Sequence, residues 1–287
     1  MKNKRILIVG ATGRVGGEVL RRLSEQRTNL RVLVRRPAVI KSLPGGIEAA
    51  VGDLGNQAQV AAAVDGVTDV LVAIRDCPEQ PELEGNLIDA ARAAGVQRFV
   101  KVSAFAAGLS PPPGYGRIHA EIENKLQKSG MRCTILRPYM YMQNFFDVAS
   151  AIRAAGLIPF PLGRCRIAFI DAHDVARVAS AVLSNDKHAQ GTYVLTGPDA
   201  MSVRDCADVL GNSLDRKLRY LPVPQWLAGL MMRRDGISRW DIDMRAELFR
   251  MLRAGGEAET TDSVEQLTGK AGTTFAEFAA KNRGAFN

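Results

Sequence analysis

Arg5-Ile-Leu-Ile-Val9 runs directly into Gly10-Ala-Thr-Gly13-Arg-Val-Gly16, and this stretch decides the fold. The first five residues form a short apolar run, which is typical of a parallel strand buried on both faces. Glycine closes the run, and residues 15–23 then have helical character. The sequence therefore predicts a strand, a tight turn and a helix in direct succession.

Strand and helix patterns alternate through the first half of the chain. We expect five further strands, at residues 30–34, 48–51, 69–74, 98–102 and 132–136. Helices are expected near Val39 and at residues 57–64, 83–94 and 117–128. Six strands joined by helices are the pattern of an α/β fold with a doubly wound parallel sheet.

The pattern loosens after Arg137-Pro138, and this change suggests a second unit. Residues 191–197 have the composition of a loop, and the chain closes with a helical pattern from Thr260 to Arg283. We divide the chain into residues 1–155, which hold the sheet, and residues 156–287, which form a smaller C-terminal α/β substrate lobe over its carboxyl edge.

Composition excludes several classes of protein. Of the 287 residues, 46% are hydrophobic and 24% are charged, which is ordinary for a folded domain and unlike a disordered chain. The longest apolar stretches, such as residues 70–74 and 226–232, are far shorter than a membrane-spanning helix, so we expect no membrane partner. The apolar run from Ile6 to Val9 is too short for a signal-peptide core, so we expect a cytoplasmic protein.

Cysteine and histidine are sparse. The chain has four cysteines and three histidines, with no pair of cysteines at the spacing of a zinc site. We therefore expect no metal and no disulfide framework.

Positive charge is concentrated at the start of the chain. The net charge is +8, and residues 1–41 contain eleven lysine or arginine residues against two glutamates. A basic segment can bind nucleic acid, but neither a recognition helix nor interleaved aromatic residues accompany this one. We therefore expect no nucleic-acid partner and assign the charge to a small polyphosphate ligand.

Three glycines at GxxGxxG spacing occupy the first turn. Glycines there allow the backbone to approach a pyrophosphate, and the following helix offers it unpaired N–H groups and the positive end of its dipole. This arrangement predicts a Rossmann domain that binds NAD(P), although turn formation and packing are an alternative reason for the glycines. The residues of the turn that we expect to bind the dinucleotide are Gly10, Thr12, Gly13, Arg14, Val15 and Gly16.

Two arginines follow the second predicted strand. In sites selective for NAD, a carboxylate at this place accepts hydrogen bonds from the ribose 2′-OH. Here Arg35 and Arg36 replace it, and guanidinium groups suit a 2′-phosphate through charge-assisted hydrogen bonds. We therefore predict NADPH as the cofactor, with Arg14 able to close on the same phosphate. Solvated surface charges are the alternative for Arg35 and Arg36.

The carboxyl ends of the other strands complete the predicted cofactor site. Ligands of open α/β sheets bind outside these ends. The residues expected there are Asp53 and Leu54 beside the adenine, Ala73, Ile74 and Arg75 along the middle of the dinucleotide, and Ser103, Pro138 and Tyr139 near the nicotinamide. For each of them, packing within a loop is the alternative.

Several motifs together resemble one family. They are Gly10-x-x-Gly13-x-x-Gly16, Gly52-Asp53-Leu54, Arg98-Phe-Val-Lys-Val-Ser103, Ile135-Leu-Arg-Pro138 with Asn144, and Ile170-Asp-Ala-His-Asp-Val-Ala176. They resemble the atypical short-chain dehydrogenases of the NmrA-like group, and within it the quinone reductase and triphenylmethane-dye reductase type. The resemblance covers nearly the whole chain and implies NADPH binding and a carboxyl-terminal substrate lobe. The group also contains non-catalytic redox sensors.

The helix before the sixth predicted strand departs from the wider short-chain dehydrogenase pattern. Most of those enzymes carry Tyr-x-x-x-Lys there, where the lysine lowers the pKa of the phenol so that it can exchange a proton with a carbonyl. This chain has His119-Ala-Glu-Ile-Glu123, and the residue four positions after Tyr115 is His119. The missing pair favours acceptors that need positioning more than protonation.

Two residues are candidates for a catalytic role. His119 can supply a proton, because imidazole titrates near neutral pH; the alternative is a structural histidine paired with Glu123. Tyr139 can stack on a flat substrate or form a hydrogen bond to its oxygen; the alternative is a core aromatic residue.

The prediction is an NADPH-dependent oxidoreductase that transfers a hydride to a flat electron-poor or cationic acceptor, such as a quinone, an imine or iminium, or a dye. One alternative is a non-catalytic NADP(H)-sensing regulatory protein, with the predicted helices at 226–234 and 240–253 as its contact face. A sugar-nucleotide epimerase is a weaker alternative, because it needs the missing Tyr–Lys pair. The only partner we predict is a small-molecule hydride acceptor; its identity and the oligomeric state are left open.

Overall fold

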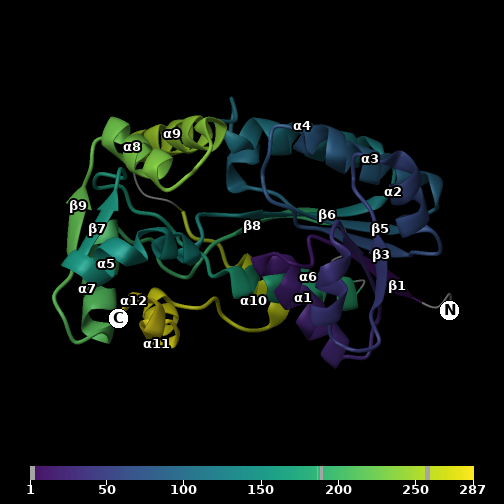
Figure 1. The fold of residues 1–287 in the computed structure, drawn as a ribbon, viewed down its shortest axis with the longest axis horizontal. Coiled ribbons are helices and arrows are strands. Elements are labelled where there is room, and N and C mark those ends of the chain that lie inside the picture. The colour runs from purple at the N-terminus through teal and green to yellow at the C-terminus, as the bar shows by residue number, and fades with distance from the viewer. Residues whose placement is uncertain (1–3, 186, 188–189, 256–258) are drawn as a thin grey trace.

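A seven-stranded parallel sheet forms the centre of the molecule (Figure 1). The computed structural model describes residues 4–185, 187, 190–255 and 259–287. The strand order is β3-β2-β1-β4-β5-β6-β8. Successive strands are added on one side of β1 up to β3 and on the other side from β4 onward, as in a doubly wound fold. The strands are β1 (Arg5–Val9), β2 (Asn29–Val34), β3 (Glu48–Val51), β4 (Asp69–Val72), β5 (Arg98–Val102), β6 (Arg132–Pro138) and β8 (Gly191–Leu195). The predicted α/β Rossmann fold is confirmed.

Helices cover both faces of this sheet (Figure 1). On one face lie α1 (Arg14–Glu25), α6 (Ala172–Ser184) and α10 (Ser263–Thr268), and on the other α2 (Gln57–Val64), α3 (Gln80–Ala93) and α4 (Tyr115–Lys128). Each layer has its own buried core, because successive strand residues point to opposite faces. Ile8, for example, lies in one core and Leu7 in the other. Short 3-10 helices occur at η1 (Pro37–Ser42), η2 (Phe105–Gly108) and η3 (Met142–Val148).

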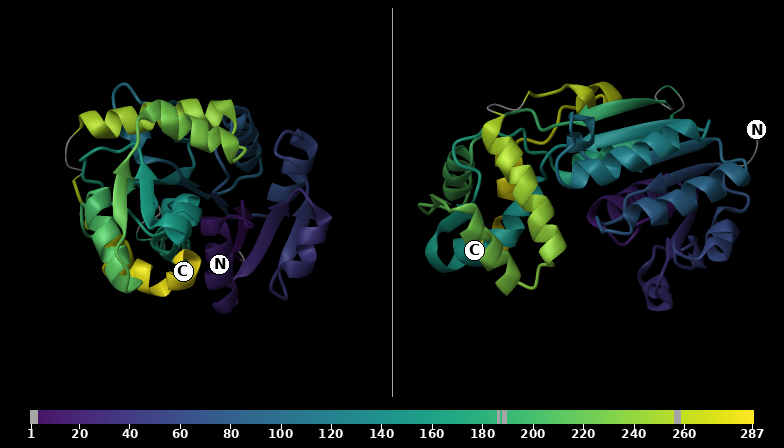
Figure 2. Two further views of the ribbon diagram at one scale, coloured as in Figure 1. Left: turned by 60° about the vertical axis from the view of Figure 1, so that its left-hand side comes forward. Right: turned by 90° about the horizontal axis from the view of Figure 1, so that it is seen from above.

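A smaller lobe gathers at one end of the sheet (Figure 2). It contains a two-stranded parallel sheet with its own helices and a separate aromatic core. Phe145 lies at the centre of this core, where its ring contacts those of Phe160, Phe169 and Phe275. The elements of the lobe are α5 (Ala149–Ala155), β7 (Leu157–Phe160), α7 (Val203–Ser213), β9 (Arg219–Pro222), α8 (Gln225–Arg234), α9 (Arg239–Ala254), α11 (Phe275–Lys281) and α12 (Arg283–Phe286).

The segment predicted as a loop at residues 191–197 contains a strand instead. Residues 191–195 form β8, which pairs with β6 from Thr134↔Gly191 to Pro138↔Leu195. This short run can be recognised as a strand only through its pairing with β6, which is distant in the sequence. The strand β8 and the helix α6 lie after residue 155 in the chain and pack with the large sheet. The division at residue 155 stays a prediction.

The described residues lack the features of a membrane span and of a metal site. Within those residues, no helix has both the length and the apolar composition that crossing a bilayer requires. The same residues contain no cluster of three or more side chains suited to holding a metal ion.

A buried ion pair joins the sheet to the end of α6. Arg98 on β5 is 1% exposed, and its guanidinium donates to the carboxylate of Asp69 on β4. It also donates to the carbonyl oxygens of Val182 (2.9 Å) and Leu183 (2.7 Å), in the last turn of α6. Carbonyl groups there carry the negative end of the helix dipole, so a cation stabilises this end.

Replacing Asp69 with Asn should destabilise the fold strongly. Loss of the carboxylate leaves the Arg98 charge buried without a counter-ion, which costs about 3–5 kcal/mol of unfolding free energy. Urea unfolding followed by circular dichroism measures this cost. The matched control is Asp89→Asn, because the Asp89 side chain is 67% exposed and its ion pair with Lys125 lies at the surface. Equal unfolding midpoints for the two variants would contradict the assignment.

Candidate active site

A cavity of about 620 Å³ opens at the carboxyl edge of the large sheet. The turn after β1 and the segments after β4, β5 and β6 line one side, and residues of the smaller lobe line the other. The strand ends contribute residues 13–15, 73–76, 102–106 and 138–141. Helix α4 contributes Tyr115 and His119. The smaller lobe contributes Asn144, Asp147, Phe160, Ile237, Asp241, Arg245, Leu248 and Phe249. This is the place where doubly wound folds bind ligands.

The three glycines of the first turn meet different constraints. Gly10 has φ +91°, and a Cβ atom there would lie 2.2 Å from the carbonyl oxygen of Ala73. A Cβ atom at Gly16 would lie 2.3 Å from the carbonyl oxygen of Gly10. Packing within the protein therefore requires both of these glycines. Gly13 is less constrained, since its nearest neighbour would be the Gly10 oxygen at 3.2 Å, and it lines the cavity.

The start of α1 has the chemistry of an anion site. Gly13 is the N-cap residue and provides no side-chain acceptor, and the first turn contains no acidic residue. The N–H groups of this turn have no acceptor within the helix, and the helix dipole adds positive character. Thr12 and Arg14 are exposed here, while Val15 is buried beneath them. The Arg14 guanidinium lies 6.0 Å from the ring centre of Phe146.

The remaining predicted cofactor residues fall into two groups. Ala73, Ile74, Arg75, Ser103, Pro138 and Tyr139 all line the cavity. Arg35, Arg36 and Asp53 are exposed at the same edge of the sheet but outside the cavity lining. The Asp53 carboxylate accepts a hydrogen bond from the Gly55 N–H (2.8 Å). Leu54 is 8% exposed and packs in the core.

His119 pairs with Asp76, so the alternative pairing with Glu123 is wrong. Its Nε2 atom lies 3.0 Å from Asp76 Oδ1, and its Nδ1 atom is buried without a partner. Glu123 instead accepts hydrogen bonds from the Ser103 hydroxyl and from the guanidinium of Arg137. A guanidinium on the neighbouring strand is a stronger partner for a carboxylate than a histidine one turn away.

The two tyrosines of the cavity have different surroundings. The Tyr139 ring stacks on Phe105, with ring centres 3.8 Å apart and planes at 23°. Burial raises the pKa of the Tyr139 phenol. The Tyr115 hydroxyl lies 3.2 Å from the backbone carbonyl oxygen of Asp241 on α9 and 3.2 Å from Oδ1 of the same residue. Burial is the largest cause that raises the pKa of Tyr115.

Several charged residues of the cavity were not predicted. Asp241 forms an ion pair with Arg75 (3.2 Å), and Arg245 forms one with Asp147 (3.2 Å). Asp76 directly follows the predicted Arg75, so extending the strand-end rule by one residue could have found it. The residues of α9 lack such a signal, because only tertiary packing brings that helix to the cavity.

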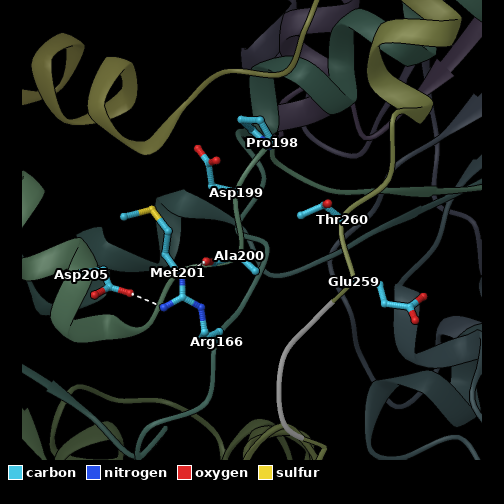
Figure 3. A pocket seen from close by; sticks show the side chains of 8 residues that line it. All are labelled: Arg166, Pro198, Asp199, Ala200, Met201, Asp205, Glu259 and Thr260. Carbon is cyan, nitrogen blue, oxygen red and sulfur yellow. Dashed lines mark hydrogen bonds and ion pairs between the residues drawn. The ribbon is translucent and has the colours of Figure 1, made fainter.

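A second depression of about 820 Å³ lies in the smaller lobe (Figure 3). Its lining consists of Arg166, Pro198, Asp199, Ala200, Met201, Asp205, Glu259 and Thr260. The Arg166 guanidinium is bound to the Asp205 carboxylate (3.1 Å) and the Ala200 carbonyl (2.7 Å). None of our predicted site residues lines this depression, so we place the site in the cavity at the sheet edge.

Comparisons with known proteins agree on one family over the full length. A model described as the NmrA-like family matches residues 2–281. The chain is 36% identical to an NAD(P)H azoreductase of Xenophilus azovorans, covering 98% of this chain and 99% of that protein. It is 32% identical to a (4-alkanoyl-5-oxo-2,5-dihydrofuran-3-yl)methyl phosphate reductase of Streptomyces griseus, with coverage of 98% and 99%.

Solved structures give the same result. The NADPH complex of the quinone oxidoreductase QOR2 from Escherichia coli has a TM-score of 0.88 and 28% identity, covering 96% of this chain and 99% of that one. The negative transcriptional regulator NmrA has a TM-score of 0.78 at 17% identity, with coverage of 97% and 95%, and this likeness shows the fold alone.

Alanine at Gly10 should destabilise the protein far more than alanine at Gly13. The first change forces a Cβ atom against the Ala73 carbonyl at a positive φ, whereas Gly13 has φ −84° and more space. We expect a clear fall in the melting temperature for Gly10→Ala and a small change for Gly13→Ala. Thermal unfolding of both variants measures the difference, and similar melting temperatures would refute the assigned contact.

Proposed function

The chain belongs to the NmrA-like family, and we propose that it is an NADPH-dependent reductase that transfers a hydride to a flat electron-poor or cationic acceptor. The family match confirms the resemblance stated from the motifs. Full-length relatives that are named oxidoreductases make it an NAD(P)H-dependent oxidoreductase of the atypical short-chain type. One observation carries the proposal: a single cavity reaches from the glycine turn to the aromatic side chains at the ends of β5 and β6.

The residues of the glycine turn fit a dinucleotide. The first turn of α1 offers N–H groups without a competing carboxylate, and Gly13 leaves the backbone accessible to a pyrophosphate. Arg14 lies beside this turn with an exposed side chain that can bind phosphate oxygens, while Arg75 lines the cavity in its ion pair with Asp241. NADPH bound there would supply the hydride.

Arg35 and Arg36 support NADPH over NADH. Both follow β2 and are exposed, and neither forms an ion pair with a carboxylate of the described residues. Guanidinium groups that lack a carboxylate partner remain available for a phosphate. We therefore assign these two residues to the 2′-phosphate.

The hydroxyl groups near the cavity support an acceptor that does not depend on a Tyr–Lys relay. The Ser103 hydroxyl donates to Glu123, and the Tyr115 hydroxyl lies against Asp241. Quinones, iminium ions and carbocations accept a hydride without forming a localised alkoxide, so positioning is sufficient for them. Phe105 and Tyr139 can position a flat acceptor through their rings.

The alternative is an NADP(H) sensor without turnover. The outer face of α8 gives it some support, because Trp226 is 71% exposed and Leu230 is 59% exposed, one helical turn apart. Such a protein would bind the dinucleotide and present this face to a partner. Turnover separates the two functions.

Replacing Arg35 with Asp should weaken NADPH binding about tenfold or more, since a charge-assisted hydrogen bond contributes about 1.5–3 kcal/mol. The affinity for NADH should fall much less, because NADH lacks the 2′-phosphate. Calorimetric titration with both nucleotides measures this, with Arg92→Asp as a control at an exposed arginine on α3. Equal losses for both nucleotides would contradict the role assigned to Arg35.

NADPH oxidation in the presence of quinones, cationic dyes and imines tests the proposed reaction directly. We expect acceptor-dependent loss of absorbance at the wavelength of NADPH. Tight NADPH binding without turnover of any acceptor would favour the sensor instead.

A further inference from the structure

One carboxylate of the cavity differs from the others in its partners. Asp147 and Asp241 each form an ion pair with an arginine, so their charges are largely compensated. Among the residues that the structure describes, the hydrogen-bond partner of the Asp76 carboxylate is His119, and no lysine or arginine forms an ion pair with Asp76. The Asp76 side chain is 35% exposed, whereas His119 is 4% exposed. Both residues line the cavity, and Asp76 is the more exposed of the two.

One tautomer of His119 satisfies the hydrogen-bond geometry. With the proton on Nε2, the ring donates to Asp76 and leaves no buried N–H group without an acceptor. A second proton would place an N–H donor at the buried Nδ1 atom, where no acceptor lies. In this assignment His119 positions the carboxylate without neutralising it.

Aromatic side chains line the same cavity as Asp76. Tyr115, His119 and Tyr141 line the cavity with it. Burial raises the pKa of Tyr141, the negative charge of Asp76 adds to the rise, and the positive charge of Arg14 opposes it. A carboxylate among aromatic rings is a suitable site for a flat organic cation, since both the charge and the rings attract it.

We infer that Asp76 is a specificity-determining residue that selects flat acceptors with a delocalised positive charge. This inference rests on the proposed function and narrows its acceptor class. Arg14 lines the same cavity and its charge also acts on Tyr141. The phosphates proposed to bind at the glycine turn would take up the charge of Arg14, which leaves Asp76 for the acceptor.

The reaction of such an acceptor balances without a proton donor. The acceptor cation takes up a hydride from bound NADPH, so one C–H bond forms on the acceptor as one breaks on the reductant. Both electrons move with the hydrogen, and the acceptor becomes neutral. Because its positive charge falls as the hydride arrives, Asp76 stabilises the bound cation more than the transition state.

Steady-state kinetics of Asp76→Asn should therefore differ between a cationic and a neutral acceptor. With crystal violet, a triarylmethyl cation, KM should rise about tenfold, the effect of one partly exposed charge pair, while kcat is unchanged or higher. With menadione, a neutral quinone, negative charge develops during reduction, so kcat should not fall. Equilibrium binding of crystal violet to the nucleotide-free protein, followed by dye absorbance, should weaken by the same factor.

Two further variants control this test. Asp76→Glu keeps the carboxylate and should retain the affinity for crystal violet. Asp89→Asn removes one negative charge from the exposed surface and should leave KM and kcat unchanged with both acceptors. An unchanged KM for crystal violet in Asp76→Asn, or a change confined to the KM of NADPH, would overturn the inference, as would a wild-type protein that reduces menadione but not crystal violet. A wild-type protein that reduces no acceptor would instead overturn the proposed function.

Discussion

The contact between the glycine turn and the end of β4 determines the geometry of the site. The backbone at Gly10 approaches the Ala73 carbonyl so closely that no side chain fits between them. This contact holds the start of α1 beside the segment that follows β4. An anion site at the helix and the charged residues Arg75 and Asp76 therefore share one cavity. The parallel sheet and its flanking helices hold both partners of this contact.

Buried polar networks lie beneath the strand ends. Ser103 and Arg137 both bind Glu123, which ties β5 and β6 to α4. On β5, the Lys101 ammonium nitrogen lies 2.8 Å from a carboxylate oxygen of Glu84 on α3, and both side chains are buried. Satisfied charges in a low-dielectric interior hold neighbouring elements in one geometry. These networks therefore support the strand ends that line the cavity.

The sequence predicted the large sheet well because its signals are local. The bounds of β1, β3 and β5 match the predicted strands, since each is a short run closed by a turn. The strand β8 was missed, because its pairing with β6 spans more than fifty residues of sequence. The site divides in the same way. Strand-end residues were predicted from topology, whereas the pairing of His119 with Asp76 required knowing how far the segment after β4 turns back toward α4.

The smaller lobe sets the part of the cavity that the strand pattern leaves undefined. Helix α9 lies against the start of α4, where Glu247 accepts hydrogen bonds from the Gly114 N–H (3.0 Å) and the Arg117 guanidinium. Gly114 has φ +51°, and a Cβ atom there would lie 2.6 Å from the Met244 carbonyl oxygen. The two helices therefore meet at backbone distance, and this contact brings Asp241 and Arg245 to the cavity. Asp241 is paired with Arg75 and Arg245 with Asp147, so the charges that the lobe brings to the cavity are compensated within the protein. In the proposed function, the preference for a cationic acceptor therefore comes from Asp76, in the segment after β4.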